Sequence, residues 1–182
     1  DRIHWDLDLS QAGVSSTTQE LNTQRLAAAG KTLKTAPENP AARIARGKAH
    51  FYLGNNAEAL DDMSFLIEKA PKAPSLYQYR AVLHARLGNA EQARQDLAKY
   101  QELSSSASQA AYLDAVVSAH VQDDEAGMKR LEAFLQAHPD DGNAQYNAAC
   151  AYSIASGVVR ERDAALSETW SDRAVTLLKQ AV

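Results

Sequence analysis

The sequence has 182 residues, of which 45% are hydrophobic and 23% charged, with a formal net charge of −4 at pH 7. This composition is ordinary for a folded domain, and 8 Gly and 5 Pro are too few for a low-complexity linker or a loop-rich β-sandwich. The mild negative charge without a Lys/Arg cluster argues against nucleic acid binding, and no apolar run is long enough to predict a membrane span.

The first residues alternate between apolar and polar side chains, and the apolar ones are Ile3, Trp5, Leu7 and Leu9. A period of two is typical of an extended strand. We interpret residues 1–17 as an extended arm or linker outside the helical region. Three alternatives are open: an arm that docks on this or a neighbouring molecule, the remnant of an upstream β domain, or a free tail. Because the chain opens with Asp1, we expect an excised domain or a processed product.

The next segment predicts an amphipathic helix over residues 18–35. Thr17, followed three residues later by Glu20, has the spacing of an N-terminal capping box. The apolar face of this helix consists of Leu21, Leu26, Ala29 and Leu33. We interpret residues 18–37 as the second half of a degenerate leading repeat that shields one end of a repeat array.

A regular sequence repeat begins at Pro40. The sequence Leu53-Gly54-Asn55 recurs as Leu87-Gly88-Asn89, and Pro40, His50, Ala59 and Asp62 recur at the same interval as Pro74, His84, Ala93 and Asp96. Each period contains two stretches with helical spacing of apolar residues, which predicts one helical hairpin per period. The expected repeats are 40–73, 74–107, 108–141 and 142–182, and the expected helices are 40–53, 57–70, 74–87, 91–103, 108–121, 124–137, 142–156 and 164–181.

Local sequence marks the ends of these helices. Asn39 followed by Pro40 is typical of a helix start, and Gly54 of a helix end in the left-handed conformation. Two capping boxes are predicted for second helices, at Asn55 with Glu58 and at Asn89 with Gln92.

Arginine, aspartate and histidine residues also recur at the interval of the repeat. Arg46 with Asp62, and Arg80 with Asp96, have the same spacing along the chain, which predicts structural ion pairs between the two helices of a hairpin. His50 and His84 occupy equivalent positions in neighbouring repeats. Stacked repeats lie about 10 Å apart, so the two rings are too far apart to share a zinc ion, and we expect them to pack between helices.

Small residues recur at one position of the first helix of each hairpin, Gly47, Ala81, Ala115 and Ala149, and at one position of the second, Ala59, Ala93, Gly127 and Ala174. Large apolar residues follow the second set after four positions, at Met63, Leu97, Leu131 and Leu178. In these positions and in its period, the chain resembles the tetratricopeptide repeat family over about residues 18–182. The family's tryptophan position departs from the pattern and holds Arg43, Tyr77, Ala111 and Gln145. The resemblance implies an all-α fold, a right-handed α-solenoid of antiparallel helical hairpins.

The last repeat carries an insertion. Strict periodicity would place the small residue of its second helix at Glu161, whereas the sequence has it at Ala174. The extra residues lie within 156–168, where we expect a solvated charged loop around Arg160–Asp163. Because the chain stops after this repeat, we expect an uncovered apolar strip that includes Leu177, Leu178 and Val182. Such a strip predicts possible self-association through the C-terminal helix.

No catalytic motif is recognisable. The sequence has no Gly-rich phosphate loop, no Gly-x-Ser-x-Gly, no His-Glu-x-x-His and no pair of cysteines. We therefore expect no enzyme activity, no cofactor and no metal. Cys150 is the only cysteine and cannot form an intramolecular disulfide, which favours a reducing, cytoplasmic setting.

The resemblance implies that partners bind in a concave groove lined by the first helices of the hairpins. Carried over position by position, it nominates Ile44, Lys48, Phe51 and Tyr52; Gln78, Tyr79, Val82 and Arg86; Gln109, Tyr112, Leu113, Val116 and His120; and Asn143, Tyr146, Asn147 and Cys150. Whether Tyr79 and Tyr112 face a groove or pack between repeats is open. The family members that clamp an acidic chaperone C-terminus use several cations, and here the corresponding positions retain only Lys48.

The sequence thus predicts an interaction scaffold that binds a protein or peptide. Two alternatives are a regulatory module of a larger multidomain signalling protein, because Tyr146–Tyr152 resembles terminal repeats of bacterial multidomain kinases, and a small-peptide sensor.

Overall fold

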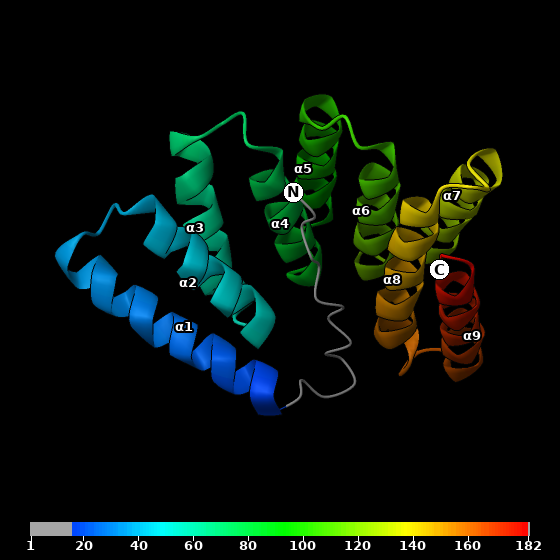
Figure 1. Ribbon diagram of the computed structural model, residues 1–182, viewed down its shortest axis with the longest axis horizontal. Helices are drawn as coiled ribbons and strands as arrows, with labels where there is room; N and C mark the ends of the chain where they lie inside the picture. The colour runs from blue at the N-terminus through cyan, green and yellow to red at the C-terminus, as the bar shows by residue number, and fades with distance from the viewer. Residues whose placement is uncertain (1–15, 182) are drawn as a thin grey trace. The chain divides into compact units, whose positions relative to one another are not determined.

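The computed structural model of the chain describes residues 16–181 (Figure 1). Its contacts define two compact units, which divide the described residues into 16–103, called the N unit, and 104–181, called the C unit. The alternating segment Ile3–Leu9 lies outside the described residues.

Every regular element of the described residues is an α-helix. The N unit contains α1 (Ser16–Thr35), α2 (Pro40–Leu53), α3 (Asn56–Lys69), α4 (Pro74–Arg86) and α5 (Ala90–Leu103), and the C unit contains α6 (Ala107–His120), α7 (Asp124–Ala137), α8 (Gly142–Val159) and α9 (Ala164–Gln180). Neighbouring helices pack as the hairpins α2/α3, α4/α5, α6/α7 and α8/α9, with α1 against α2 (Figure 1). The prediction of an all-α fold of helical hairpins is confirmed, and most helix ends lie within one residue of their expected positions.

The first helix begins earlier than its sequence predicts. Because α1 starts at Ser16, Thr17 lies inside the helix and cannot be its N-cap. The buried face also differs, because Leu21 is 44% exposed whereas Asn22 is 2% exposed. Asn22 is tolerated there because its amide donates to the Thr18 carbonyl and its Oδ1 accepts from Arg25. Ala29 and Leu33 are buried as predicted.

The turns inside the first three hairpins share one conformation. Gly54, Gly88 and Gln122, which follow one another at the interval of the repeat, have φ of 78°, 77° and 61°. After each of them, a backbone N–H donates to the carbonyl of the residue five positions earlier, and these bonds join Asn55 to His50, Asn89 to His84 and Asp123 to Ser118. The third hairpin therefore keeps a left-handed turn without the glycine that normally favours it.

The fourth hairpin lacks this turn. Ser156, which occupies the equivalent position, continues α8 to Val159. The predicted solvated charged loop is confirmed for Arg160–Asp163, which are exposed and connect the two helices, whereas the rest of the insertion is helical: residues 156–159 extend α8, and 164–168 begin α9. The added helical residues join the core, because the hydroxyl of buried Ser156 lies 3.2 Å from Ser167 Oγ and 2.7 Å from Ser171 Oγ.

The small-residue positions set how closely the two helices of a hairpin approach. Ala59, Ala93 and Ala115 are completely buried. A Cβ added to Gly47 would lie 2.7 Å from Met63 Cε, and one added to Gly127 would overlap the Ser118 side chain. Ser118 Cβ cannot move without its helix, so Gly127 leaves no room for a larger side chain, whereas Met63 Cε near Gly47 is the movable end of its side chain.

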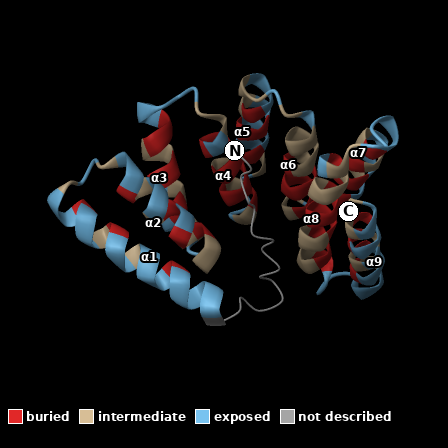
Figure 2. Cartoon of the chain, in the orientation of Figure 1, coloured by how far each residue is buried: buried red, intermediate tan, exposed pale blue. Residues whose placement is uncertain are grey.

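The last helix covers its own hairpin instead of exposing an apolar strip. Leu177 is 1% exposed and Leu178 is half-buried, so the prediction of an uncovered strip is wrong at these two residues, and Val182 lies outside the described residues. The exposed residues of α9 are mostly polar, with Val175 the large hydrophobic one (Figure 2). The length of α8 explains the difference, because the added turn gives α9 a longer partner.

We expect Gln122→Gly to stabilise the protein by about 0.5–1 kcal/mol, because glycine adopts the left-handed conformation without strain from a Cβ. Urea unfolding followed by circular dichroism measures this change. Gly88→Gln is the reverse control and should lose a similar amount. An unchanged stability in both variants would show that these turns carry no conformational strain.

We expect Gly127→Ala to destabilise the protein by about 1–2 kcal/mol, because overlap with Ser118 outweighs the gain in helix propensity. Gly30→Ala in α1 is the matched control, since nothing lies within 4 Å of its added Cβ. The control should gain about 0.5–1 kcal/mol from propensity alone. Equal shifts for the two variants in urea unfolding would contradict the role given to the Gly127 position.

Candidate partner-binding surface

An exposed stripe runs along α2. Ile44 is 37% exposed, Lys48 is exposed and Tyr52 is half-buried. Because residues four apart lie on one face of a helix, these three side chains share that face. They are the nominated residues of α2 that a partner can reach directly.

Two aromatic rings join α2 to α4. Phe51 and Tyr79 meet edge to face with centroids 5.2 Å apart, and both residues are buried. Phe51 also meets Tyr52 edge to face at 5.5 Å. Tyr79 therefore packs between repeats, against α2. This was one of the two alternatives predicted for this residue; the other was that it faces a groove.

A cationic side chain from the opposite helix lies over the Tyr79 ring and another lies over the Phe51 ring. Lys48 Nζ of α2 lies 5.4 Å from the Tyr79 centroid, and the Arg86 guanidinium carbon of α4 lies 4.4 Å from the Phe51 centroid. Arg86 also donates to the Phe51 carbonyl over 3.3 Å. Such contacts stabilise by about 0.5–1 kcal/mol at exposed sites and restrict the long side chains. The surface thus presents positioned charges.

The other nominated residues of α4 are buried. Gln78 is 5% exposed and Val82 is 6% exposed, in a helix that is buried along most of its length (Figure 2). Sequence reasoning placed these residues on the same face as Lys48, but could not show that α4 is the most buried helix of the N unit.

The nominated residues of the C unit form a surface without charge on α6 and α8. Asn143 is exposed, and Tyr112, Tyr146, Asn147, Gln109 and His120 are partly exposed, whereas Leu113 and Val116 are buried. Asn147 bridges the two helices by donating to Ser108 Oγ over 3.4 Å. Gln109 Oε1 is buried and accepts no hydrogen bond.

Cys150 lies beneath this surface. The residue is 6% exposed, and burial raises the pKa of its thiol to about 11, although the hydrogen bond with Tyr146 opposes the shift. At neutral pH the side chain is therefore a thiol, which is a poor nucleophile and a poor metal ligand.

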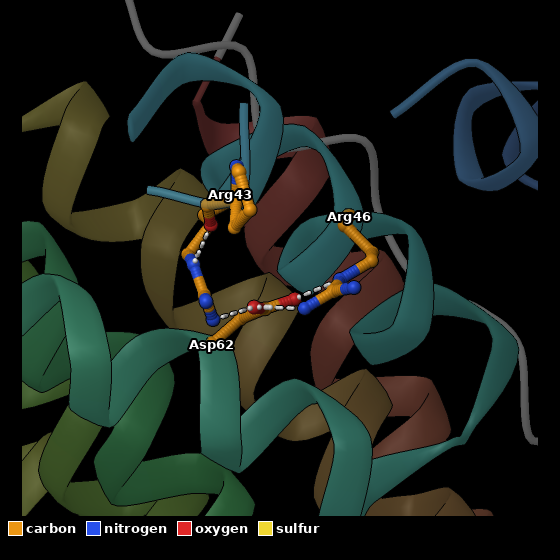
Figure 3. A network of polar contacts seen from close by, with 4 residues as sticks. Arg43, Arg46 and Asp62 are labelled. Atoms are coloured by element: carbon orange, nitrogen blue, oxygen red, sulfur yellow. Dashed lines mark hydrogen bonds and ion pairs between the residues drawn. The ribbon is translucent and has the colours of Figure 1, made fainter. Parts of the chain in front are cut away.

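The predicted ion pairs of the first two hairpins are confirmed. Arg46 donates two hydrogen bonds of 2.8 Å to Asp62, whose side chain is fully buried, and Arg43 adds a third of 3.1 Å (Figure 3). Arg80 binds Asp96 in the same way at 2.7 and 2.8 Å. The hydrogen bonds to the carboxylates raise the pKa of Arg46 and Arg80, against the opposing effect of burial.

A third pair occupies the same positions with the charges exchanged. In the third hairpin, Asp114 on the first helix accepts hydrogen bonds of 2.6 and 3.1 Å from Arg130 on the second. The sequence analysis did not predict this pair. Its two residues are separated along the chain by the same interval as the pairs in the first two hairpins, and that interval could have predicted it. The fourth hairpin, once its insertion is allowed for, has Ala148 and Leu177 at these positions, and both are buried.

The predicted capping box at Asn55 is wrong at the atomic level, and the one at Asn89 stays a prediction. Asn55 makes no side-chain cap hydrogen bond; its amide lies 3.2 Å from His50 Nδ1, and the Asn89 amide lies 3.5 Å from His84 Nδ1. His50 thus takes the Asn55 side chain that would otherwise cap the next helix. Burial lowers the pKa of His84 below its usual value, despite the Asp96 carboxylate 4.0 Å from its Nε2. By contrast, Asn39 caps α2 as predicted, accepting from Ala42 N.

The C unit contains a further polar cluster that sequence reasoning missed. Glu132 of α7 accepts from Arg173 of α9 at 2.8 and 3.0 Å, and from the Tyr152 hydroxyl of α8 at 2.8 Å. Burial opposes its ionisation, but these hydrogen bonds and the Arg173 charge keep the pKa of Glu132 below its usual value. Burial and the Glu132 carboxylate raise the pKa of Tyr152. Arg173 and Tyr152 both donate to Glu132, and the three residues belong to α9, α8 and α7, so the cluster joins three helices.

Within residues 16–181, no group of three or more His, Cys, Asp or Glu side chains is placed to hold a metal ion. In the same range, no helix combines the length and apolar character needed to cross a membrane.

Comparison with known proteins identifies the fold. No family model matches the chain, and no curated protein matches it. Two crystal structures of MamA, a helical-repeat protein, are similar. One has a TM-score of 0.54 at 17% identity over 86% of this chain and 84% of that chain, and the other a TM-score of 0.53 at 17% identity over 86% and 78%. Likeness at this identity establishes an α-solenoid type of fold, and supports the tetratricopeptide resemblance only as a helical repeat.

We expect the order of charges in the third hairpin to be exchangeable. Asp114→Arg alone places two arginines together and should destabilise the protein, whereas Asp114→Arg with Arg130→Asp restores an ion pair in the order of the first two hairpins. Because Arg130 is half exposed, we expect a coupling of about 0.5–1 kcal/mol. Urea unfolding of the two single variants and the double variant measures it. A double variant no more stable than Asp114→Arg would show that the two charges are not exchangeable, because Arg130 also contacts Ser118 and Asp123.

Proposed function

We propose that the protein is a non-catalytic interaction scaffold that binds a peptide or protein partner on its first helices. The observation that carries this proposal is the surface of α2 and α4, where Ile44, Lys48 and Tyr52 are accessible and Arg86 is fixed across from them. Positioned aromatic and cationic side chains are the residue types that dominate binding energy at interfaces.

The anchoring contacts favour this role because they reduce the entropy lost on binding. A free lysine or arginine side chain loses about 1.5–2 kcal/mol of rotamer entropy when it is immobilised. Lys48 and Arg86 rest on the rings of Tyr79 and Phe51, so part of that freedom is already lost in the unbound protein.

The ion pairs of the described residues join helices to one another, which suits a scaffold. The cationic side chains in ion pairs are held by carboxylates of the same hairpin or unit, and the only cysteine is a buried thiol. The likeness to MamA supports the fold alone. A regulatory role in a larger signalling chain and a cytoplasmic location both stay predictions from the sequence.

One observation favours the small-peptide sensor as a second candidate. Gln109 Oε1 is buried without a hydrogen bond, and leaving such an acceptor unsatisfied costs about 1–3 kcal/mol. Rotation of the half-buried Gln109 side chain towards the surface of α6 and α8 would let a peptide N–H satisfy this oxygen. Asn143 at the same surface is exposed and can bind a peptide backbone through its amide.

We expect selection from a random dodecapeptide library to enrich sequences on the wild-type protein that are lost on a surface variant. The variant combines Lys48→Ala, Tyr52→Ala and Arg86→Ala, and removes the accessible cations and ring. The matched control combines Leu21→Ala, Lys31→Ala and Lys34→Ala, which are exposed on α1 of the same unit. The control should keep the enriched sequences. Equal enrichment on all three proteins, or none on the wild type, would contradict the proposal.

A further inference from the structure

The first helices of the C unit repeat one pair of side chains. Gln109 and Tyr112 of α6 recur as Asn143 and Tyr146 of α8 at the interval of the repeat. In both helices a carboxamide thus precedes a tyrosine by three residues, and residues at that spacing lie on one face of a helix. Each helix therefore carries one carboxamide and one ring on the same face.

Contacts between α6 and α8 place the two pairs next to each other (Figure 1). Asn147, which follows Tyr146, donates over 3.4 Å to the hydroxyl of Ser108, which precedes Gln109. Asn143 is exposed, and the other three residues of the two pairs are half-buried. Because packed helices lie about 8–10 Å apart, the pairs repeat at about that distance on an accessible surface.

The Tyr146 ring is held by its own helix. Its side chain forms a hydrogen bond with Cys150, a buried residue one turn further along α8. A ring that is already restricted loses less conformational freedom when a ligand packs on it. The contact therefore favours binding on this ring.

The surface carries no formal charge. α8 contains no Asp, Glu, Lys or Arg, and Asp114, the one such residue of α6, binds Arg130 of α7. A charged ligand side chain would lose water here without gaining a partner of opposite charge. The surface therefore suits an uncharged ligand.

The distance between the two pairs favours a peptide in the polyproline II conformation. Such a segment has three residues per turn and rises about 3.1 Å per residue, so it presents the same side about every 9 Å. A β-strand presents the same side after about 7 Å, which matches the helix spacing less well. An α-helix bonds its own N–H and C=O groups, so the carboxamides would find no free backbone partner.

The residue types on α6 and α8 match such a segment. A polyproline II backbone has no internal hydrogen bonds, and a carboxamide can both donate to its C=O groups and accept from its N–H groups. Gln109 Oε1 accepts no hydrogen bond in the unbound protein, and it gains a donor when the side chain rotates towards the ligand. Aromatic rings are the surfaces on which proline-rich segments dock.

We propose that α6 and α8 bind an uncharged, proline-containing segment of another protein in the polyproline II conformation. Prolines three residues apart pack on Tyr112 and Tyr146, and Gln109 and Asn143 bind the backbone between them. The proposal rests on the small-peptide candidate for this surface and names its ligand by chemistry. It is independent of the surface of α2 and α4.

Fluorescence anisotropy with three labelled peptides, blocked at both ends, tests the ligand. The probe consists of Pro-Ala-Gln repeats, which place an uncharged proline at every third residue. A peptide of Gly-Ala-Gln repeats lacks the prolines that fix the polyproline II conformation. The third peptide has the composition of the probe, but its prolines are separated alternately by two and by four residues.

Protein variants test the assignment to α6 and α8. Tyr112→Leu with Tyr146→Leu removes both rings, whereas Tyr112→Phe with Tyr146→Phe keeps them and tests for rescue. Gln109→Glu with Asn143→Asp keeps the shape of the carboxamides but removes their donors. The matched control Phe134→Leu removes a ring from α7, a second helix of the same unit. Circular dichroism confirms that each variant is folded.

We expect the probe to bind the wild type, the phenylalanine variant and the Phe134→Leu control. It should bind the leucine variant and the acidic variant at least about tenfold more weakly, as expected when central anchors of an interface are lost. The other two peptides should bind the wild type at least about tenfold more weakly than the probe. Added salt should leave the affinity for the probe unchanged, because neither surface is charged.

Other outcomes separate this inference from the candidate on which it rests. If either of the other two peptides binds the wild type as tightly as the probe and is lost on the leucine variant, the polyproline II ligand is overturned and a peptide surface stays. Unchanged binding of the probe to the leucine and acidic variants overturns the assignment to α6 and α8. Binding of a maltodextrin in place of the probe identifies a saccharide as the ligand and overturns the inference. No binding of any peptide overturns both the inference and the small-peptide candidate.

Discussion

The close approach of two helices within each hairpin determines most of this structure. Gly47 and Gly127 lie where a Cβ would overlap the facing helix, and Ala59 and Ala93 are completely buried at the equivalent contacts. Asp62 lies next to Met63, which packs on Gly47, so the same close contact draws a carboxylate into the interior. An unpaired buried charge is costly, and the guanidinium groups of the first helix therefore become a requirement of the packing.

The four hairpins satisfy this requirement in different ways. Arg–Asp pairs occupy the first two, an Asp–Arg pair the third, and Ala148 with Leu177 the fourth. A buried ion pair can be replaced by well-packed apolar residues at little cost, provided that both charges leave together. The repeat thus preserves the filled volume and the absence of an unpaired charge, and leaves the sign and even the presence of charge free to vary.

Sequence periodicity could predict the hairpins because they depend on small residues and apolar spacing, which a single chain displays directly. It could not predict the Asn55 side chain, because capping the next helix and binding His50 compete for the same amide. The left-handed turn at Gln122 lacked its glycine signal, and the insertion near Ser156 became helix because its hydroxyl found partners in α9. For the candidate surface, the residue types were predictable, but the burial of Tyr79 and Gln78 follows from packing that no single helix reveals.

The location of the buried carboxylates connects the fold to the surface. Asp62 and Asp96 belong to second helices, and the arginines that they bind belong to α2 and α4, so the packing itself concentrates cations on the first helices. Arg46 and Arg80 serve the interior, whereas Lys48 on the outer face of α2 lies over the Tyr79 ring. Lys48 lies two residues from Arg46 and about half a helical turn away from it, on the exposed stripe. A helix that meets a structural need with one face can therefore expose other side chains, such as Ile44 and Lys48, on the opposite face.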